Sequence, residues 1–217
     1  MNKVIEELLK ALDKNCMKGI YANTKEDAIK IVKDMLFKGA KITNGGSVTL
    51  SECGIYDLLN NGDYNYLDRN RKGITEEERL SVYKNVLDSD FYFCSANAIT
   101  QNGELINVDG RCNRISAISF GPKKVILIVG TNKIVKDIDE GFLRIKKIAA
   151  PKNCVRLNKN TPCAKLGYCI SLQKSDNPEI TDGCDSPDRI CATYNIIGKQ
   201  MEKDRIVVII CDENLGY

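Results

Sequence analysis

The chain has 217 residues, enough for one large domain or two small ones, and a hydrophobic content of 43% is sufficient for a sizeable core. Its 32 basic and 29 acidic residues are interspersed, leaving a net charge of +3 without the basic stripe that indicates nucleic-acid binding. No apolar run approaches the length of a membrane span, and the amphipathic N-terminus does not resemble a signal peptide. We therefore expect a cytoplasmic protein that binds neither nucleic acid nor membrane.

The sequence contains no histidine and ten cysteines. The missing imidazole excludes Ser-His-Asp and Cys-His catalysis, so a general base must be a carboxylate, lysine, cysteine or tyrosine. A metal site made of protein side chains is likewise restricted to cysteine, aspartate and glutamate. In a cytoplasmic chain, this many cysteines indicate metal or redox chemistry rather than disulfides.

The first predicted elements are N-terminal helices within residues 1–38. Residues 2–14 carry apolar side chains at helical spacing, and Thr24 can cap a second helix that runs to Phe37. The residues around Cys16–Asn23 are expected to form the loop between them. Both helices are interpreted as packing elements without chemistry of their own.

A glycine-rich loop follows the first predicted strand. Lys41–Asn44 leads into Gly45-Gly46-Ser47, and Val48–Leu59 is expected to be one helix. This order brings backbone N–H groups against an anion, although a glycine pair at a strand end is also typical of a plain turn. Glu52 lies about one and a half turns into the helix and could face the same crevice or solvent.

The central stretch, residues 91–133, contains two apolar strands that each end in a small polar loop. Phe91–Cys94 is followed by Ser95-Ala96-Asn97, and the run Lys123–Val129 is followed by residues 130–133. Between them, Gln101-Asn102-Gly103 predicts the turn of a hairpin formed by residues 98–100 and 104–108. Because open α/β sheets bind ligands where buried strands end, we expect a ligand site here.

The remaining segments continue an alternation of strands and helices. It predicts one α/β domain over residues 1–217, with a largely parallel sheet covered on both faces. The elements are a strand at Tyr64–Leu67, a helix from the capping box at Thr75 to about Leu87, a helix from Asp137 or Asp139 that ends before Pro151, and a last strand at Arg205–Cys211.

Residues 158–191 form a cysteine-rich segment with little periodicity, too long for a bare loop unless something holds it. Its cysteines follow the spacing C-x5-C-x14-C-x6-C at Cys163, Cys169, Cys184 and Cys191. Four thiolates suit an iron–sulfur cluster or a tetrahedral zinc ion, and we favour the cluster; free or reversibly oxidised thiols are the third interpretation. Arg189, two residues from a cysteine, could offset the negative charge of such a site.

Taken together, these motifs resemble the LUD-domain family, the group named after lactate-utilisation protein C. The matching pieces are GGSVTLSECG (45–54), NAITQNGELINVDGRCNR (97–114), FGPKKVILIVGTNKIVKD (120–137), IAAPKNCVRL (148–157), TPCAKLGYC (161–169) and SPDRIC (186–191). The resemblance implies the NagB/RpiA/CoA-transferase-like fold, a three-layer α/β sandwich whose relatives bind sugar phosphates, CoA esters or other small anions. Better-known members oxidise L-lactate to pyruvate together with two iron–sulfur partner proteins; this chain is similar to a stand-alone subgroup that carries the cysteine tetrad.

Mapped onto this family, the motifs predict a crevice for a small anionic metabolite. Glu52 and Asp109 are the motif carboxylates available as a base, and Arg114 or Lys133 would pair with a carboxylate or phosphate. Turn formation and a structural ion pair are the alternative roles for several of these residues. The predicted ligand-binding residues are Gly45, Gly46, Ser47, Asn97, Thr100, Asn113, Arg114, Gly130, Asn132 and Lys133.

Three functions are compatible with these features. The favoured one is a redox enzyme, or a subunit of one, that acts on a small hydroxy or oxo acid and works with iron–sulfur electron-transfer proteins. The second is a non-redox enzyme acting on a phosphorylated or CoA-linked metabolite. The third is a binding module that senses a metabolite or redox state, with structural zinc or free thiols. Relatives with this fold often associate, so the resemblance is compatible with a homo-oligomer.

Overall fold

The computed structural model describes residues 1–217 and contains two packed sheets. The larger sheet is entirely parallel, with the order β1-β10-β7-β4-β2-β3, and the smaller one has the order β8-β5-β6-β9. The strands of the larger sheet are β1 (Lys18–Ala22), β2 (Lys41–Asn44), β3 (Asn65–Tyr66), β4 (Phe91–Cys94), β7 (Lys124–Gly130) and β10 (Ile206–Cys211). The smaller sheet contains β5 (Ala98–Thr100), β6 (Leu105–Asp109), β8 (Ile134–Val135) and β9 (Thr193–Ile197).

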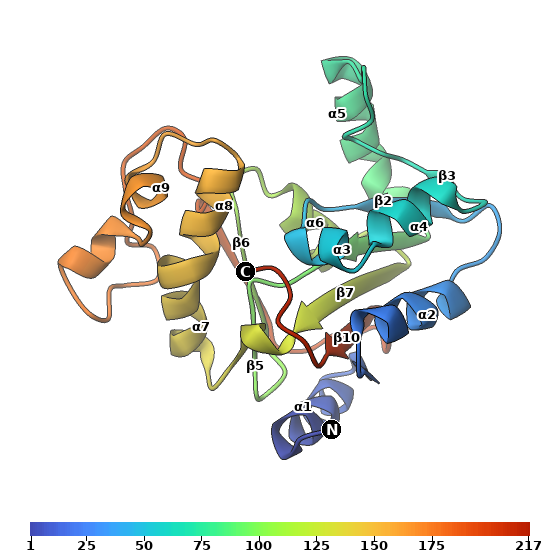
Figure 1. The fold of residues 1–217 in the computed structure, drawn as a ribbon, viewed down its shortest axis with the longest axis horizontal. Helices are drawn as coiled ribbons and strands as arrows, with labels where there is room; N and C mark the ends of the chain where they lie inside the picture. Colours follow the sequence, from blue (N-terminus) through green and yellow to red (C-terminus); the bar gives the residue numbers. More distant parts are fainter.

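Helices cover both faces of the parallel sheet (Figure 1). One apolar core joins α2, α3 and α4 to one face, a second joins α1, α6 and the smaller sheet to the other, and a third joins α7 and α8 to the far side of the smaller sheet. The predicted three-layer α/β sandwich is therefore confirmed. The helices are α1 (Lys3–Lys14), α2 (Lys25–Met35), α3 (Val48–Glu52), α4 (Ile55–Asn61), α5 (Glu76–Asn85), α6 (Asn113–Ser119), α7 (Ile138–Arg144), α8 (Ala150–Arg156) and α9 (Pro162–Leu166).

Strands β7 and β10 form the centre of the parallel sheet, as their composition predicts. Every residue of β10 is buried, and β7 is buried from Val125 onward. Branched aliphatic side chains on both faces suit a strand that is covered by helices on both sides. Since all six strands run the same way, their carboxyl ends meet at one edge, and the loops after β2, β4, β7 and β10 lie there together.

Two predictions for the N-terminal region are wrong. The expected loop around Cys16–Asn23 contains the edge strand β1, which pairs only with β10 and is mostly half-buried, so it lacks the apolar run that marks a central strand. The single helix expected over Val48–Leu59 is two helices, α3 and α4. They are separated at Gly54, whose φ of 66° is left-handed and ends the first helix.

The helix expected to end before Pro151 continues as α8. A π-helical turn, η3 (Ile145–Ala149), joins α7 to α8 without a break. Pro151 follows directly after this wider turn, which accommodates a residue that has no N–H to give to the helical ladder. Strand β9, for which the sequence analysis predicts no element, pairs antiparallel with β6. The predicted hairpin of residues 98–108 and the capping box at Thr75 are confirmed.

No helix in the structure has both the length and the apolar character of a membrane span.

Candidate functional site

A crevice of about 440 Å³ opens at the carboxyl edge of the parallel sheet. Its wall includes loop residues after β2, β3 and β4, the start of α6, the end of α8 and the C-terminal tail. Its charged lining is strongly unbalanced, because a single carboxylate, Asp109, faces several cations. Such a lining attracts anions. The cations are Arg69, Arg79, Arg111, Arg114, Lys133, Arg156 and Lys159.

The structure brings most, but not all, of the predicted site residues into this crevice. The lining includes Gly46, Ser47, Asn97, Asp109, Asn113, Arg114 and Lys133. Outside it are Gly45, Glu52, Thr100, Gly130 and Asn132. The catalytic and binding roles expected of these residues remain predictions.

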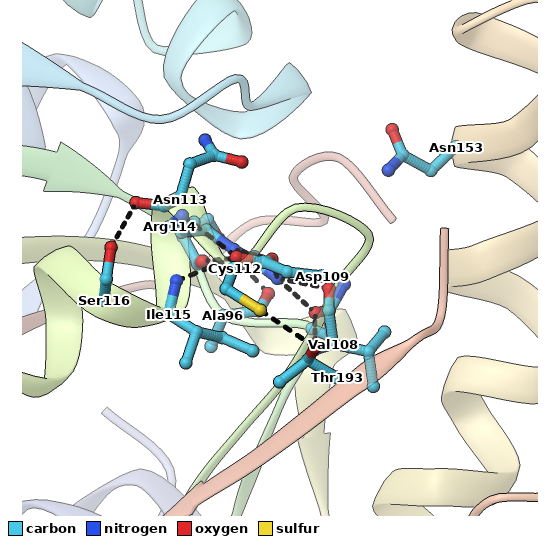
Figure 2. A network of polar contacts seen from close by, with 12 residues as sticks. Ala96, Val108, Asp109, Cys112, Asn113, Arg114, Ile115, Ser116, Asn153 and Thr193 are labelled. Atoms are coloured by element: carbon cyan, nitrogen blue, oxygen red, sulfur yellow. Dashed lines mark hydrogen bonds and ion pairs between the residues drawn. The ribbon is translucent and has the colours of Figure 1, made fainter. Parts of the chain in front are cut away.

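Arg114 and Asp109 form a closed hydrogen-bond network at the crevice wall (Figure 2). The Nε of Arg114 donates to Oδ1 of Asp109 at 3.0 Å, and the backbone N–H groups of Arg114 and Ile115 donate to Oδ2 at 2.9 and 2.8 Å. The remaining guanidinium nitrogens donate to Ser95 O, Asn97 Oδ1 and Val108 O. Only one N–H of Arg114, on Nη1, remains for a ligand. The geometry thus favours a bracing role for this pair.

Lys133 is buried at the base of the crevice, with 2% of its surface exposed. Its Nζ donates to Thr49 Oγ1 at 2.7 Å and to Ser95 Oγ at 3.0 Å, and it makes no ion pair. Burial, followed by the positive charges of Arg144 and Arg114, lowers the pKa of Lys133 to about 7. Near neutral pH this amine can therefore bind an oxygen atom as an ammonium ion or accept a proton as a free base.

Three of the predicted residues outside the crevice hold the C-terminal tail against it. Glu52 Oε2 accepts the N–H of Gly216 at 2.6 Å, and Asn132 exchanges hydrogen bonds with Leu215 and Gly216. A Cβ on Gly130 would lie 2.6 Å from the Leu215 nitrogen, so the glycine leaves room for the tail. The tail in turn places the side chain of Tyr217 in the crevice lining.

The two others have local structural roles. Thr100 is fully buried, and its hydroxyl hydrogen-bonds with the side chain and backbone N–H of Glu104 inside the β5–β6 hairpin. A Cβ on Gly45 would lie 2.8 Å from the hydroxyl of Tyr92, so this glycine permits close packing.

Sequence reasoning missed several cations of the crevice, notably Arg69 and Arg156. Arg69 follows strand β3, so it lies at the same carboxyl edge of the sheet as the predicted ligand-binding loops. The same rule that indicated those loops could therefore have indicated Arg69. Arg156 belongs to the motif IAAPKNCVRL but lies on a helix that was expected to stop at residue 150. Tyr217 depends on the path of the tail, for which the sequence carries no signal.

A second cavity, mostly apolar, lies beside α7 and α8. All four cysteines of the predicted tetrad line it, and so do Phe142, Ile145, Lys146, Ala150, Ile170, Ile180, Asp182 and Tyr194. No three thiols have the arrangement that one metal ion requires. The Sγ of Cys163 lies 3.6 Å from that of a fifth cysteine, Cys154, and their shared hydrogen bond lowers the pKa of Cys163 and raises that of Cys154.

Two cations organise this cysteine cavity. Arg189 donates from Nε to Cys191 O at 2.9 Å and from Nη1 to Cys184 O at 3.3 Å, which ties the backbones of two predicted ligands together. Lys146 lines the cavity and donates from Nζ to Asp182 O, and burial lowers its pKa. Donors and charges of this kind suit a group held by several thiolates.

Similar proteins are found among solved structures and domain families. A crystal structure of a DUF162 family protein from Deinococcus radiodurans aligns with 96% of this chain and 96% of that chain, at 13% identity and a TM-score of 0.48. The crystal structure of eIF2B beta from Chaetomium thermophilum aligns with 64% of this chain and 45% of that chain, at 13% identity and a TM-score of 0.39. No curated protein sequence matches. The family model of the LUD domain matches residues 5–211, and the chain therefore belongs to the LUD-domain family.

Proposed function

We propose that this LUD-domain protein is a redox enzyme, or a subunit of one, that acts on a small hydroxy or oxo acid in the crevice and carries an iron–sulfur cluster on Cys163, Cys169, Cys184 and Cys191. One observation carries the proposal. Four cysteines that are spread over a long irregular segment line a single cavity, although local structure alone would not bring them together.

We propose a cluster rather than a single zinc ion. Zinc needs four sulfur atoms at about 2.3 Å from one point, and the structure contains no such group of thiols. A cluster of several iron and sulfide ions is larger and takes cysteine ligands that stand further apart. The cluster would supply one-electron chemistry when bound, and Lys146 and Arg189 would offset part of its negative charge.

The cavity and the crevice share a wall. On α8, Ala150 faces the cysteine cavity, whereas Asn153 and Arg156 line the crevice. Ile190 lines the crevice next to Cys191 of the cavity. A substrate and a redox group would therefore lie on two sides of the same short helix, which suits electron transfer between them.

In this proposal the chain's own residues bind the acid and move a proton. The cations of the crevice attract the carboxylate, and the free amine of Lys133 accepts the proton of the substrate hydroxyl group. Oxidation of the hydroxy acid to the oxo acid also releases the Cα–H proton, which would go to water, and two electrons, which would pass to iron–sulfur partner proteins in a cytoplasmic setting. A second candidate, a non-redox enzyme acting on a phosphorylated or CoA-linked metabolite, is favoured by the excess of cations in the crevice.

The test is iron and acid-labile sulfide analysis of protein purified without oxygen, with a visible spectrum. We expect both elements in the parent chain and neither in the double variant Cys163→Ser, Cys191→Ser. The matched control, Cys16→Ser with Cys53→Ser, changes one half-buried and one buried cysteine elsewhere and should keep the metal. Iron retained by the first variant refutes the tetrad, and zinc without iron in the parent chain supports the non-redox enzyme or the sensing module.

A further inference from the structure

Two guanidinium groups converge above Gly46. A methyl group on this glycine would lie 3.0 Å from Nη2 of Arg69 and 3.8 Å from Nη2 of Arg156. The two arginines come from separate elements, the loop after β3 and the end of α8, yet both reach the same point. The N–H of Gly46 donates to no acceptor within the protein.

Neither arginine has an acidic partner. Arg156 donates only to neutral oxygens, those of Asn153 and Tyr217, and Arg69 lies over the ring of Tyr83 at 5.6 Å. The Nε of Arg69 is buried without any hydrogen-bond partner. The nearby Asp68 accepts the N–H of Asn70 and makes no ion pair. Like charges held this close destabilise a protein unless an anion lies between them.

We infer that Arg69, Arg156 and the N–H of Gly46 form a subsite for the phosphate group of a small phosphate monoester. Two guanidinium forks match the charge of a phosphate monoester, which is close to −2 at neutral pH, whereas a carboxylate would neutralise only one of them. The inference rests on the proposed function only in taking the crevice as the substrate site. It narrows the substrate to a phosphorylated hydroxy or oxo acid or, under the second candidate function, to another phosphorylated metabolite.

The rest of the crevice agrees with a small ligand of this class. Asn113 and Lys133 line the same 440 Å³ volume, at the lower end of the range for small-molecule sites. A ligand anchored by its phosphate at Gly46 could present its other end to the Lys133 amine. Phosphate binding then fixes position, while Lys133 acts on the opposite end.

The probe is 2-phosphoglycolate, with glycolate as its phosphate-free analogue, titrated calorimetrically into the full chain. We expect phosphoglycolate to bind at least about tenfold more tightly than glycolate, and Arg69→Met or Arg156→Met to weaken it about tenfold or more, because each removes a charge-assisted contact. The matched control is Arg71→Met: Arg71 is two residues from Arg69 but pairs with Glu78 outside the crevice, so affinity should stay unchanged.

Gly46→Ala provides a test that leaves both charges in place. Gly46 does not have a positive φ, so alanine fits the backbone, but its methyl group would occupy the point between the two guanidinium groups. Phosphoglycolate affinity should fall, with an unchanged circular dichroism spectrum. Equal affinity for glycolate and phosphoglycolate, or an equal loss in the Arg71 control, would overturn the inference.

Iron and sulfide content, measured on the same samples, separates this inference from the proposed function. Tight phosphoglycolate binding by protein without a cluster would uphold the phosphate subsite and refute the redox proposal. A protein that contains the cluster but binds phosphoglycolate and glycolate equally would refute the phosphate subsite and uphold the redox proposal.

Discussion

Replacing Lys133 with methionine should change how the stability of the protein depends on pH. The side chain is buried, its Nζ contacts only two hydroxyl groups, and burial together with Arg144 and Arg114 lowers its pKa from 10.5 to about 7. Methionine has a similar length and no charge. The substitution therefore removes the titration and keeps most of the packing.

The sign and size of the effect follow from proton linkage. Because the folded-state pKa lies below the unfolded-state value, the unfolded chain binds more protons between about pH 7 and 10.5, and stability rises with pH in that window. Below pH 7 both states carry the proton, so the cost of the buried charge is then fully present. Between pH 6 and 8.5 the parent chain should gain about 2 kcal/mol of unfolding free energy that the methionine variant does not gain.

The assay is urea denaturation under reducing conditions at several pH values from 6 to 8.5, for the parent chain and Lys133→Met. The difference between the two isolates Lys133, because titration of the cysteines is common to both chains. Loss of the hydrogen bonds to Thr49 and Ser95 shifts the variant by an amount that does not depend on pH. Lys136→Met, which changes an 80% exposed side chain, should retain the parent pH dependence. Parallel curves for the parent and Lys133→Met would refute the argument.

Other substitutions test the framework around the site. Asp109→Asn should cost about 3 kcal/mol of unfolding free energy, since it leaves the mostly buried Arg114 without its counter-charge, whereas Asp63→Asn breaks the exposed pair with Lys38 and should have no measurable effect in the same urea experiment. Ile209→Ala, in the middle of β10, should cost about 3 kcal/mol and Ile209→Val about 1 kcal/mol; equal values would mean that the site repacks. Thr24→Ala removes the hydroxyl that caps α2 and should lower the thermal midpoint by an amount equivalent to about 1 kcal/mol.

The parts of the fold that the sequence predicts well are those with a local signal. Strands β7 and β10 are apolar on both faces, and the Asn-Gly turn between β5 and β6 has a specific backbone requirement. Strand β1 was missed because it is an edge strand whose partner, β10, is almost two hundred residues away in the sequence. In the sequence, Gly54 looks like a glycine within one continuous helix, and only its positive φ shows that the helix ends there.

The candidate site divides in the same way. Loops that follow parallel strands can be grouped from the sequence, and together with the family motifs this grouping predicts that Ser47, Asn97 and Lys133 lie near one another. The bracing role of Arg114 and the tail-holding role of Asn132 depend on hydrogen bonds to residues that only the tertiary structure identifies. A motif match reports that a residue belongs to the region of a site, but it does not separate ligand contacts from the residues that hold the walls.

The helix α8 shows why the cysteine cavity and the crevice are best considered together. The π-helical turn before it inserts an extra residue into the helical ladder, which changes the direction in which later side chains point. As a result, Ala150 and Cys154 face the cysteine-rich segment, while Asn153 and Arg156 face the anionic ligand site. Any group that the cysteines bind would contact one side of α8, and the other side of α8 carries Arg156 of the phosphate subsite. Metal content and anion affinity should therefore be measured on the same preparation, because binding at the cysteine cavity can shift α8 and so change anion affinity in the crevice, and the reverse.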